Sequence, residues 1–126
     1  MRNGPVFQTK RIYIPAERDD GIRILVDRLW PRGGSKAGAR IDRWMKDIAP
    51  SPELRKWFGH RPERFAEFAR KYEWELVTDE TKQALVGELL SLSGTVTLLY
   101  AAKDEQHNHA IVLREFLRNI AKEGFG

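Results

Sequence analysis

The chain has 126 residues, of which 41% are hydrophobic, 32% are charged and none is cysteine. This length fits one domain, and the apolar fraction is too high for a disordered chain. The lack of Cys excludes disulfide frameworks, thiol nucleophiles and thiolate metal sites. The chain contains no run of about 18 apolar residues, the length needed to cross a membrane. Its start lacks the apolar stretch of a signal peptide. We therefore expect a single cytoplasmic domain over residues 1–126.

The basic residues gather in the first part of the chain. Residues 1–72 hold 17 Lys and Arg against 9 Asp and Glu, whereas residues 73–126 hold 5 against 9. The two parts therefore carry +8 and −4, although the net charge of the whole chain is only +4. By itself, such an imbalance suggests a nucleic-acid partner.

Two strands are predicted near the start of the chain. Residues 6–14 are rich in β-branched and aromatic side chains, and residues 22–27 are almost entirely apolar, as in a strand covered on both faces. Pro31 and nearby glycines then interrupt regular structure, which predicts a loop over residues 28–39. Long loops inside compact domains are often functional.

Helices and one further strand follow. Apolar spacing and capping residues predict helices over residues 41–48, 51–59, 62–76, 81–92 and 108–124. The β-branched run at residues 95–102 predicts the third strand. This order indicates an α/β domain in which helices pack on a small, mainly parallel sheet. The helical crossover makes the second and third strands parallel neighbours, so their carboxyl ends open on one edge, where ligands usually bind in such sheets.

The loop after the second strand is the first candidate site. Asp27, Arg28 and Arg32 place a carboxylate and two guanidiniums within six residues, next to glycines that let backbone amides approach a ligand. Guanidiniums and free N–H groups suit a phosphate or carboxylate. Alternatively, Asp27 pairs with one arginine and the other is solvated. Trp30 in the same loop could line a pocket, stack on a nucleic-acid base or cover the edge of the sheet.

The loop after the third strand is the second candidate. It contains Lys103, Asp104 and Asn108 and leads into the first turn of a helix, where free N–H groups and the helix dipole favour an anion. His109 in that turn could give or accept a proton near neutral pH, or it could be a surface or capping residue.

Neither loop predicts a metal or a nucleotide cofactor. His107 and His109 are two residues apart and would face away from each other on a helix, with no third ligand at a fixed spacing. The chain has neither the glycine-lysine pattern of a P-loop nor the glycine pattern of a dinucleotide fold.

A basic pattern begins in the first loop and continues just after it. Basic side chains recur every three or four positions, at Arg28, Arg32, Lys36, Arg40 and Arg43. Because Pro31 and the glycines rule out one continuous helix, these side chains form either a solvated face or a footprint for nucleic acid or an anionic substrate.

Three blocks of this sequence resemble the YeaO-like family of small bacterial proteins, a branch of a larger family of unknown function. The blocks are residues 21–33, 48–58 and 98–104, the last joined by Asn108, His109 and Ala110. The resemblance implies the same fold and the same site, but no established activity.

The wider family carries cysteines in its last block, and these are missing here. Tyr100 and Asn108 stand where relatives have Cys, Ala102 stands at a Glu position, and Ala110 stands at an Arg position, so that only His109 is kept. The resemblance therefore implies that thiol chemistry in relatives does not extend to this chain.

Two hypotheses remain for the function. In the first, the protein is a small enzyme or ligand-binding relative of one, acting on an anionic compound that could be phosphorylated. Arg28, Arg32 and Lys103 would hold the anion, and Asp27 and His109 would be the acid and base, which requires that both reach one substrate. Trp30, Asp104 and Asn108 complete the candidate binding residues.

In the second hypothesis, the arginine-rich part of the chain binds nucleic acid, with affinity that falls steeply with salt. The sequence favours the first hypothesis, because the basic residues fall at a sheet edge facing a helix N-terminus. It does not determine the substrate or the oligomeric state.

Overall fold

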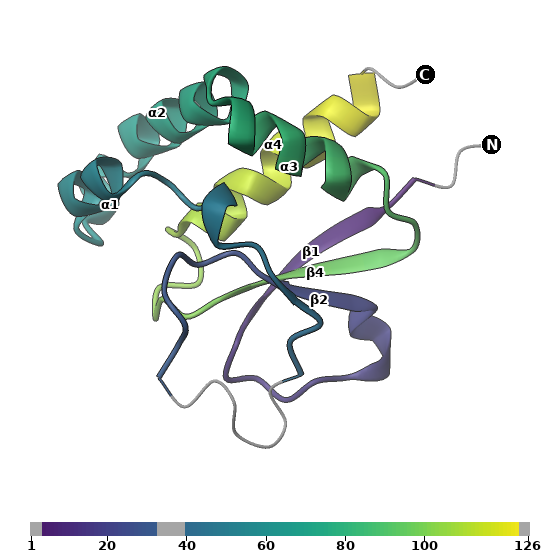
Figure 1. The fold of residues 1–126 in the computed structure, drawn as a ribbon. Helices are drawn as coiled ribbons and strands as arrows, with labels where there is room; N and C mark the ends of the chain where they lie inside the picture. The colour runs from purple at the N-terminus through teal and green to yellow at the C-terminus, as the bar shows by residue number, and fades with distance from the viewer. Residues whose placement is uncertain (1–3, 33–39, 124–126) are drawn as a thin grey trace.

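Four parallel strands form the sheet in the computed structural model, which describes residues 4–32 and 40–123 (Figure 1). The strand order in this part of the chain is β1–β4–β2–β3. The strands are β1 (Val6–Arg11), β2 (Ile22–Leu25), β3 (Arg43–Trp44) and β4 (Thr95–Tyr100). Every pair is parallel, and β4 lies between β1 and β2. The predicted α/β class and the parallel pairing of β2 with β4 are confirmed.

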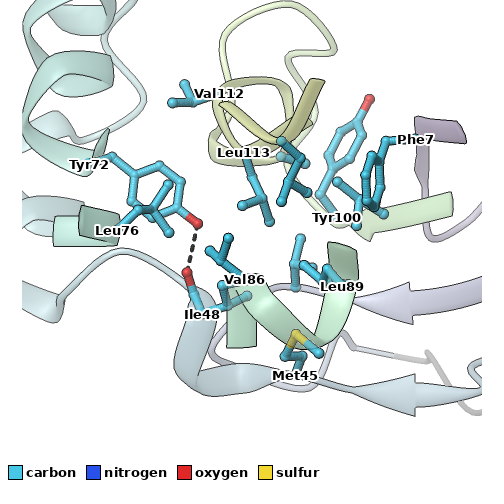
Figure 2. Packing of buried hydrophobic residues seen from close by; sticks show 14 of the residues in the cluster. Phe7, Met45, Ile48, Tyr72, Leu76, Val86, Leu89, Tyr100, Val112 and Leu113 are labelled. Carbon is cyan, nitrogen blue, oxygen red and sulfur yellow. Dashed lines mark hydrogen bonds between the residues drawn. The ribbon is translucent and has the colours of Figure 1, made fainter. Parts of the chain in front are cut away.

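The helices pack on one face of this sheet (Figure 1). They are α1 (Pro52–Phe58), α2 (Phe65–Thr78), α3 (Glu80–Leu90) and α4 (His109–Glu123). Their apolar side chains form the main core with the strands, as Figure 2 shows. Tyr72 of α2 is fully buried there and donates its hydroxyl hydrogen bond to the backbone oxygen of Ile48 over 2.6 Å. A buried phenol needs such a partner, so this bond ties α2 to the chain before α1.

Local signals explain the ends of α1. Ser51 caps its start, because the hydroxyl oxygen accepts the backbone N–H of Leu54 over 3.1 Å, and Pro52 occupies the first turn. Gly59 ends the helix with φ of 55°, in the left-handed region that glycine adopts most easily. The predicted helix over residues 51–59 is therefore confirmed.

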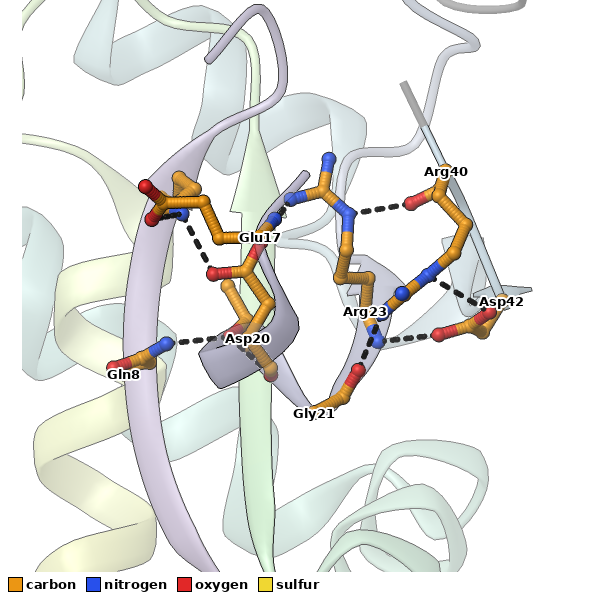
Figure 3. Close-up of polar contacts among 9 residues, drawn as sticks. Gln8, Glu17, Asp20, Gly21, Arg23, Arg40 and Asp42 are labelled. Carbon is orange, nitrogen blue, oxygen red and sulfur yellow. Dashed lines mark hydrogen bonds and ion pairs between the residues drawn. The ribbon is translucent and has the colours of Figure 1, made fainter. Parts of the chain in front are cut away.

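The opposite face of the sheet is covered by the segments before β2 and before β3, through a buried polar network (Figure 3). Arg23 of β2 is completely buried, with its Nη1 atom 2.6 Å from Asp20. Its Nε donates to the backbone oxygen of Arg40 over 2.6 Å. Lys10 of β1 also pairs with Asp20, at 2.6 Å. The guanidinium therefore holds two loop segments against the sheet.

The predicted helix over residues 41–48 is wrong. The structure has strand β3 there, followed by a single 3₁₀ turn at Lys46–Ile48. The apolar residues fit helical spacing by coincidence, because they lie on opposite faces of the sheet. Ile41 packs on the small apolar cluster of the second face, whereas Met45 and Ile48 enter the main core.

The predicted strands are also shorter than expected. They end at Arg11, Leu25 and Tyr100, so that the polar residues that follow β2 and β4 lie in loops. The end of the helix predicted over 108–124 lies outside the described residues, as does part of the loop 28–39. None of the described helices is long and apolar enough to span a lipid bilayer.

Candidate functional site

A cavity of about 530 Å³ opens beyond the carboxyl ends of β2 and β4. The segments after these strands form one side of it, and α1, α2 and the start of α4 form the other. Its lining residues are Asp27, Arg28, Leu29, Ala49, Pro50, Arg55, Phe58, His60, Phe68, Ala101, Ala102, Lys103, Asp104, Asn108 and His109. The volume suits a small molecule, and the position is the usual ligand edge of an open parallel sheet.

Both apolar and charged side chains line the cavity. Phe58 and Phe68 are both buried, and their rings stack with centroids 4.3 Å apart. Three lining residues carry cations and two carry carboxylates: Arg28, Arg55 and Lys103 against Asp27 and Asp104. A flat apolar group could therefore pack against the phenylalanine rings while an anionic group meets the cations.

Asp27 and His109 lie side by side in this cavity. The Nε2 atom of His109 is 3.2 Å from Oδ1 of Asp27 and 2.9 Å from the backbone oxygen of Val26. Since a carbonyl oxygen only accepts hydrogen bonds, Nε2 carries a proton, and in the neutral ring Nδ1 is the acceptor. The other carboxylate oxygen of Asp27 accepts the backbone N–H of Ala101 over 3.0 Å. The structure thus brings the two residues together, while their catalytic roles remain predictions.

Arg28 lines the cavity and also contacts the backbone of a distant segment of the chain. One Nη atom donates to the backbone oxygens of Ala49 and Pro50, at 3.4 and 3.3 Å, and the other lies 3.9 Å from Asp47. This guanidinium therefore holds the segment before α1 against the loop after β2. Its Nε atom is buried and has no partner among the described residues.

Asp104 and Asn108 shape the loop before α4. Asp104 accepts the backbone N–H groups of Gln106 and His107, and it pairs with the ring of His107 at 2.9 Å. These hydrogen bonds, that of Gln106 first, lower the pKa of Asp104. Asn108 is buried, accepts the backbone N–H of Ile111 over 3.0 Å and donates to the backbone oxygen of Asp104 over 2.9 Å. Both residues line the cavity, but their polar groups are largely used within the loop.

Lys103 and Arg55 are the cations that remain available. Both line the cavity and are exposed, and neither has an ion-pair partner in the described part of the chain. Lys103 belongs to the candidate set from the sequence, whereas Arg55 and the neighbouring His60 do not. Their signal in the sequence was weak: Arg55 lies in the block 48–58 that carries the family resemblance, but nothing there shows that α1 faces the cavity.

His60 has an unusual backbone conformation. Its φ is 58°, directly after Gly59 at 55°. A side chain in the left-handed region costs roughly 1–2 kcal/mol, and such residues gather at functional sites. Two successive left-handed residues turn the chain sharply after α1 and place His60 at the cavity.

Trp30 and Arg32 lie outside the residues that line the cavity. The ring of Trp30 packs edge-on against that of Trp44, and its exposed fraction is 44%. Arg32 is exposed, and its backbone oxygen accepts the hydroxyl of Tyr13 over 3.0 Å. Of the candidates from the sequence, the structure therefore brings together Asp27, Arg28, Lys103, Asp104, Asn108 and His109.

Three side chains of the predicted basic pattern have partners within the protein. Arg40 binds the backbone oxygen of Gly21 and lies 3.4 Å from Asp42, while Arg43 pairs with Glu88 of α3. Arg28 contacts the segment before α1, and Lys36 lies outside the described residues. No group of three or more His, Cys, Asp or Glu side chains that could hold a metal occurs within residues 4–32 and 40–123.

Comparisons with known proteins show the family of the chain. The model of the family DUF488-N3i, described as the inactive DUF488-N3 subclade, matches residues 6–124. The chain is 45% identical over 114 residues to the uncharacterized protein YeaO of Escherichia coli K12, which covers 90% of this chain and 98% of YeaO. It is also 45% identical over 109 residues to the uncharacterized protein Rv3073c of Mycobacterium tuberculosis H37Rv, covering 85% and 89% of the two chains.

No solved structure matches this chain. The family match spans nearly the whole sequence, and it includes all the residues that line the cavity. The chain therefore belongs to the DUF488-N3i family, the inactive DUF488-N3 subclade.

Proposed function

We propose that this protein binds a small anionic compound with a flat apolar part in the cavity at the carboxyl ends of β2 and β4. The observation that carries the proposal is the cavity itself, about 530 Å³ in volume, which is lined by the stacked rings of Phe58 and Phe68 and by the cations Arg55 and Lys103. A mostly apolar pocket with a few converging polar groups is the usual form of a ligand site.

The anionic group belongs near Lys103, Arg55 and the start of α4. The first turn of a helix leaves N–H groups without partners inside the helix, and its dipole adds positive potential. His109 begins α4 and lines the cavity, so this positive end faces the same space as the two cations. A phosphate or a carboxylate fits this combination.

The proposal is for binding without covalent chemistry. None of the described residues that line the cavity is a Ser, Thr, Tyr or Cys, so none offers a hydroxyl or thiol nucleophile. The family description as inactive points the same way. Asp27 and His109 then act by holding the ends of β2 and β4 and the start of α4 in place around the ligand.

Nucleic-acid binding along the basic pattern has less support. Arg28, Arg40 and Arg43 each have partners within the protein, so they offer no continuous row of free guanidiniums. A solvent-facing row of cations is what non-specific phosphate contacts require.

Isothermal titration calorimetry with phenyl phosphate tests the proposal, since this probe combines a flat ring with a dianion. Inorganic phosphate and phenol serve as half-ligands, and we expect both to bind more weakly than phenyl phosphate. Lys103→Ala and Arg55→Ala should each weaken binding by about tenfold, because each removes a charge-assisted hydrogen bond.

Lys56→Ala is the matched control. Lys56 is exposed on the same helix as Arg55 but does not line the cavity, so its removal should leave the affinity unchanged. The proposal is wrong if phenyl phosphate gives no binding heat at about 10 mM, which corresponds to an interaction too weak for a specific site. It is also wrong if Lys56→Ala weakens binding as much as Arg55→Ala does.

A further inference from the structure

Three exposed aromatic side chains lie at or after the carboxyl ends of β1, β2 and β3, outside the residues that line the cavity. Tyr13, Trp30 and Trp44 have exposed fractions of 45%, 44% and 38%. The rings of Trp30 and Trp44 lie 5.2 Å apart between centroids, at an angle of 68°. Tyr13 joins the same segment through its hydroxyl, which donates to the backbone oxygen of Arg32. We call Tyr13, Trp30 and Trp44 the aromatic platform.

Contacts within the protein hold Trp44 of the platform in place. Trp44 belongs to the edge strand β3, and its indole Nε1 donates to the backbone oxygen of Asp27 over 2.8 Å. Its indole is therefore fixed, although much of the ring surface meets solvent. Large aromatic side chains that are exposed together in a fixed place mark binding surfaces more often than single exposed apolar residues do.

Cations lie on two rings of the platform. The Lys46 ammonium lies over the Trp44 ring, 5.6 Å from its centroid, and the Arg11 guanidinium lies over the Tyr13 ring, 5.0 Å from its centroid. Arg32 is exposed beside Tyr13. Of the acidic groups, Asp47 follows Lys46 but faces Arg28 at 3.9 Å. Lys46 and Arg32 have no ion-pair partner among the residues that the structure describes.

We propose that the aromatic platform binds single-stranded nucleic acid, with a base stacking on Trp30 and phosphates near Lys46 and Arg32. Flat rings bordered by cations are the surface that unpaired bases and their phosphates fit. A duplex fits less well, because its bases are already stacked inside the helix. This surface lies outside the residues that line the cavity and shares only Arg32 with the basic pattern, so the proposal does not depend on the cavity.

Fluorescence anisotropy with a labelled ten-nucleotide oligo(dT) or oligo(U) tests this inference at about 50 mM salt, where phosphate contacts are strong. Trp30→Ala should weaken binding by about tenfold, the effect of losing one base stack, and Trp30→Phe should recover part of the loss. Lys46→Ala should reduce the slope of log affinity against log salt by about 0.7, the value for one phosphate contact on a single strand.

Trp74→Ala is the matched control, because Trp74 is 68% exposed on α2 and is not part of the platform. We expect it to bind like the unmodified protein, and thermal unfolding of each variant checks that the fold is intact. No binding at this salt, or an equal loss in Trp74→Ala, would overturn the proposal. Equal affinity for a duplex of the same length would rule out stacking. Equally effective displacement by a poly-glutamate peptide would indicate an acidic protein partner instead.

Discussion

Asp27 shows how one side chain serves both the fold and the candidate site. One carboxylate oxygen accepts the backbone N–H of Ala101, after β4, and the other lies 3.2 Å from the His109 ring. The side chain therefore joins β2, β4 and α4 at the cavity. An Asp27→Ala variant would loosen all three elements, so its effect on ligand binding could not be assigned to contact with the ligand. Lys103 and Arg55 are better probes, because they have no such contacts in the described structure.

Asp20 leads to a prediction about acid stability. Burial by itself raises the pKa of Asp20, but hydrogen bonds from Lys10, from the backbone of Glu17 and from Arg23 outweigh burial and lower the pKa to about 2, from 3.8. Because the pKa is lower in the folded state, the charged carboxylate stabilises the protein above about pH 4, and this contribution of about 2 kcal/mol is lost as the pH falls toward 2.

Urea unfolding of the unmodified protein and of Asp20→Asn measures this contribution. The unmodified protein should be the more stable at about pH 6, and the difference in free energy of unfolding should shrink toward about pH 2.5, where Asp20 begins to take up its proton. A difference that stays constant over this range would show that the charge of Asp20 does not stabilise the fold.

At the scale of elements, the start of α4 organises the site. His109 is its first residue, and the loop before it is closed by hydrogen bonds within residues 104–108. Asn108 makes two of the bonds that define this entry, one to the helix and one back to the loop. The position of His109 beside Asp27 therefore depends on a cap that involves neither residue.

Asn108→Ala should lower the free energy of unfolding by about 1–2 kcal/mol, because it removes a helix cap and leaves the partly buried N–H of Ile111 without its acceptor. Asn108→Asp keeps an acceptor at the cap but not the donor to the Asp104 backbone. Its stability should therefore lie between that of the unmodified protein and that of Asn108→Ala. Chemical denaturation measures both variants. An Asn108→Ala protein as stable as the unmodified one would show that the cap contributes nothing.

At the scale of the whole molecule, the two faces of the sheet are covered differently. Helices cover one face with apolar side chains, while the other is covered by loop segments held through Asp20 and Arg23 (Figure 3). Gly21 ends one of these segments, directly before β2. Its φ is 63°, and a Cβ atom placed there would lie 2.1 Å from the backbone oxygen of Thr95. Only a residue without a side chain permits this close approach.

Gly21→Ala should destabilise the protein by about 3 kcal/mol or more, because both the backbone conformation and the contact with β4 forbid a methyl group. Gly87→Ala is the matched control, because a Cβ atom there meets nothing within 4 Å and Gly87 lies inside α3. Alanine favours helix over glycine, so this variant should gain about 1 kcal/mol. Thermal or urea unfolding compares the two, and similar stabilities would contradict the close approach seen at Gly21.

The sequence by itself determined the α/β class, the parallel pairing of β2 with β4 and the limits of α1. These follow from local patterns: β-branched runs, the Ser51–Pro52 start and the Gly59 stop. The sequence also located the two loops of the candidate site, because parallel strands joined by helices must end on the same edge.

Only the tertiary structure decided which side chains meet there. Helical spacing at residues 41–48 gave a wrong prediction, because Ile41 and Met45 pack on opposite faces of the sheet. Arg55 and His60 reach the cavity because α1 packs over it, whereas Trp30 packs on Trp44 of β3 at the sheet edge. Such placements depend on contacts between residues far apart in the chain, about which local spacing and residue type carry no information.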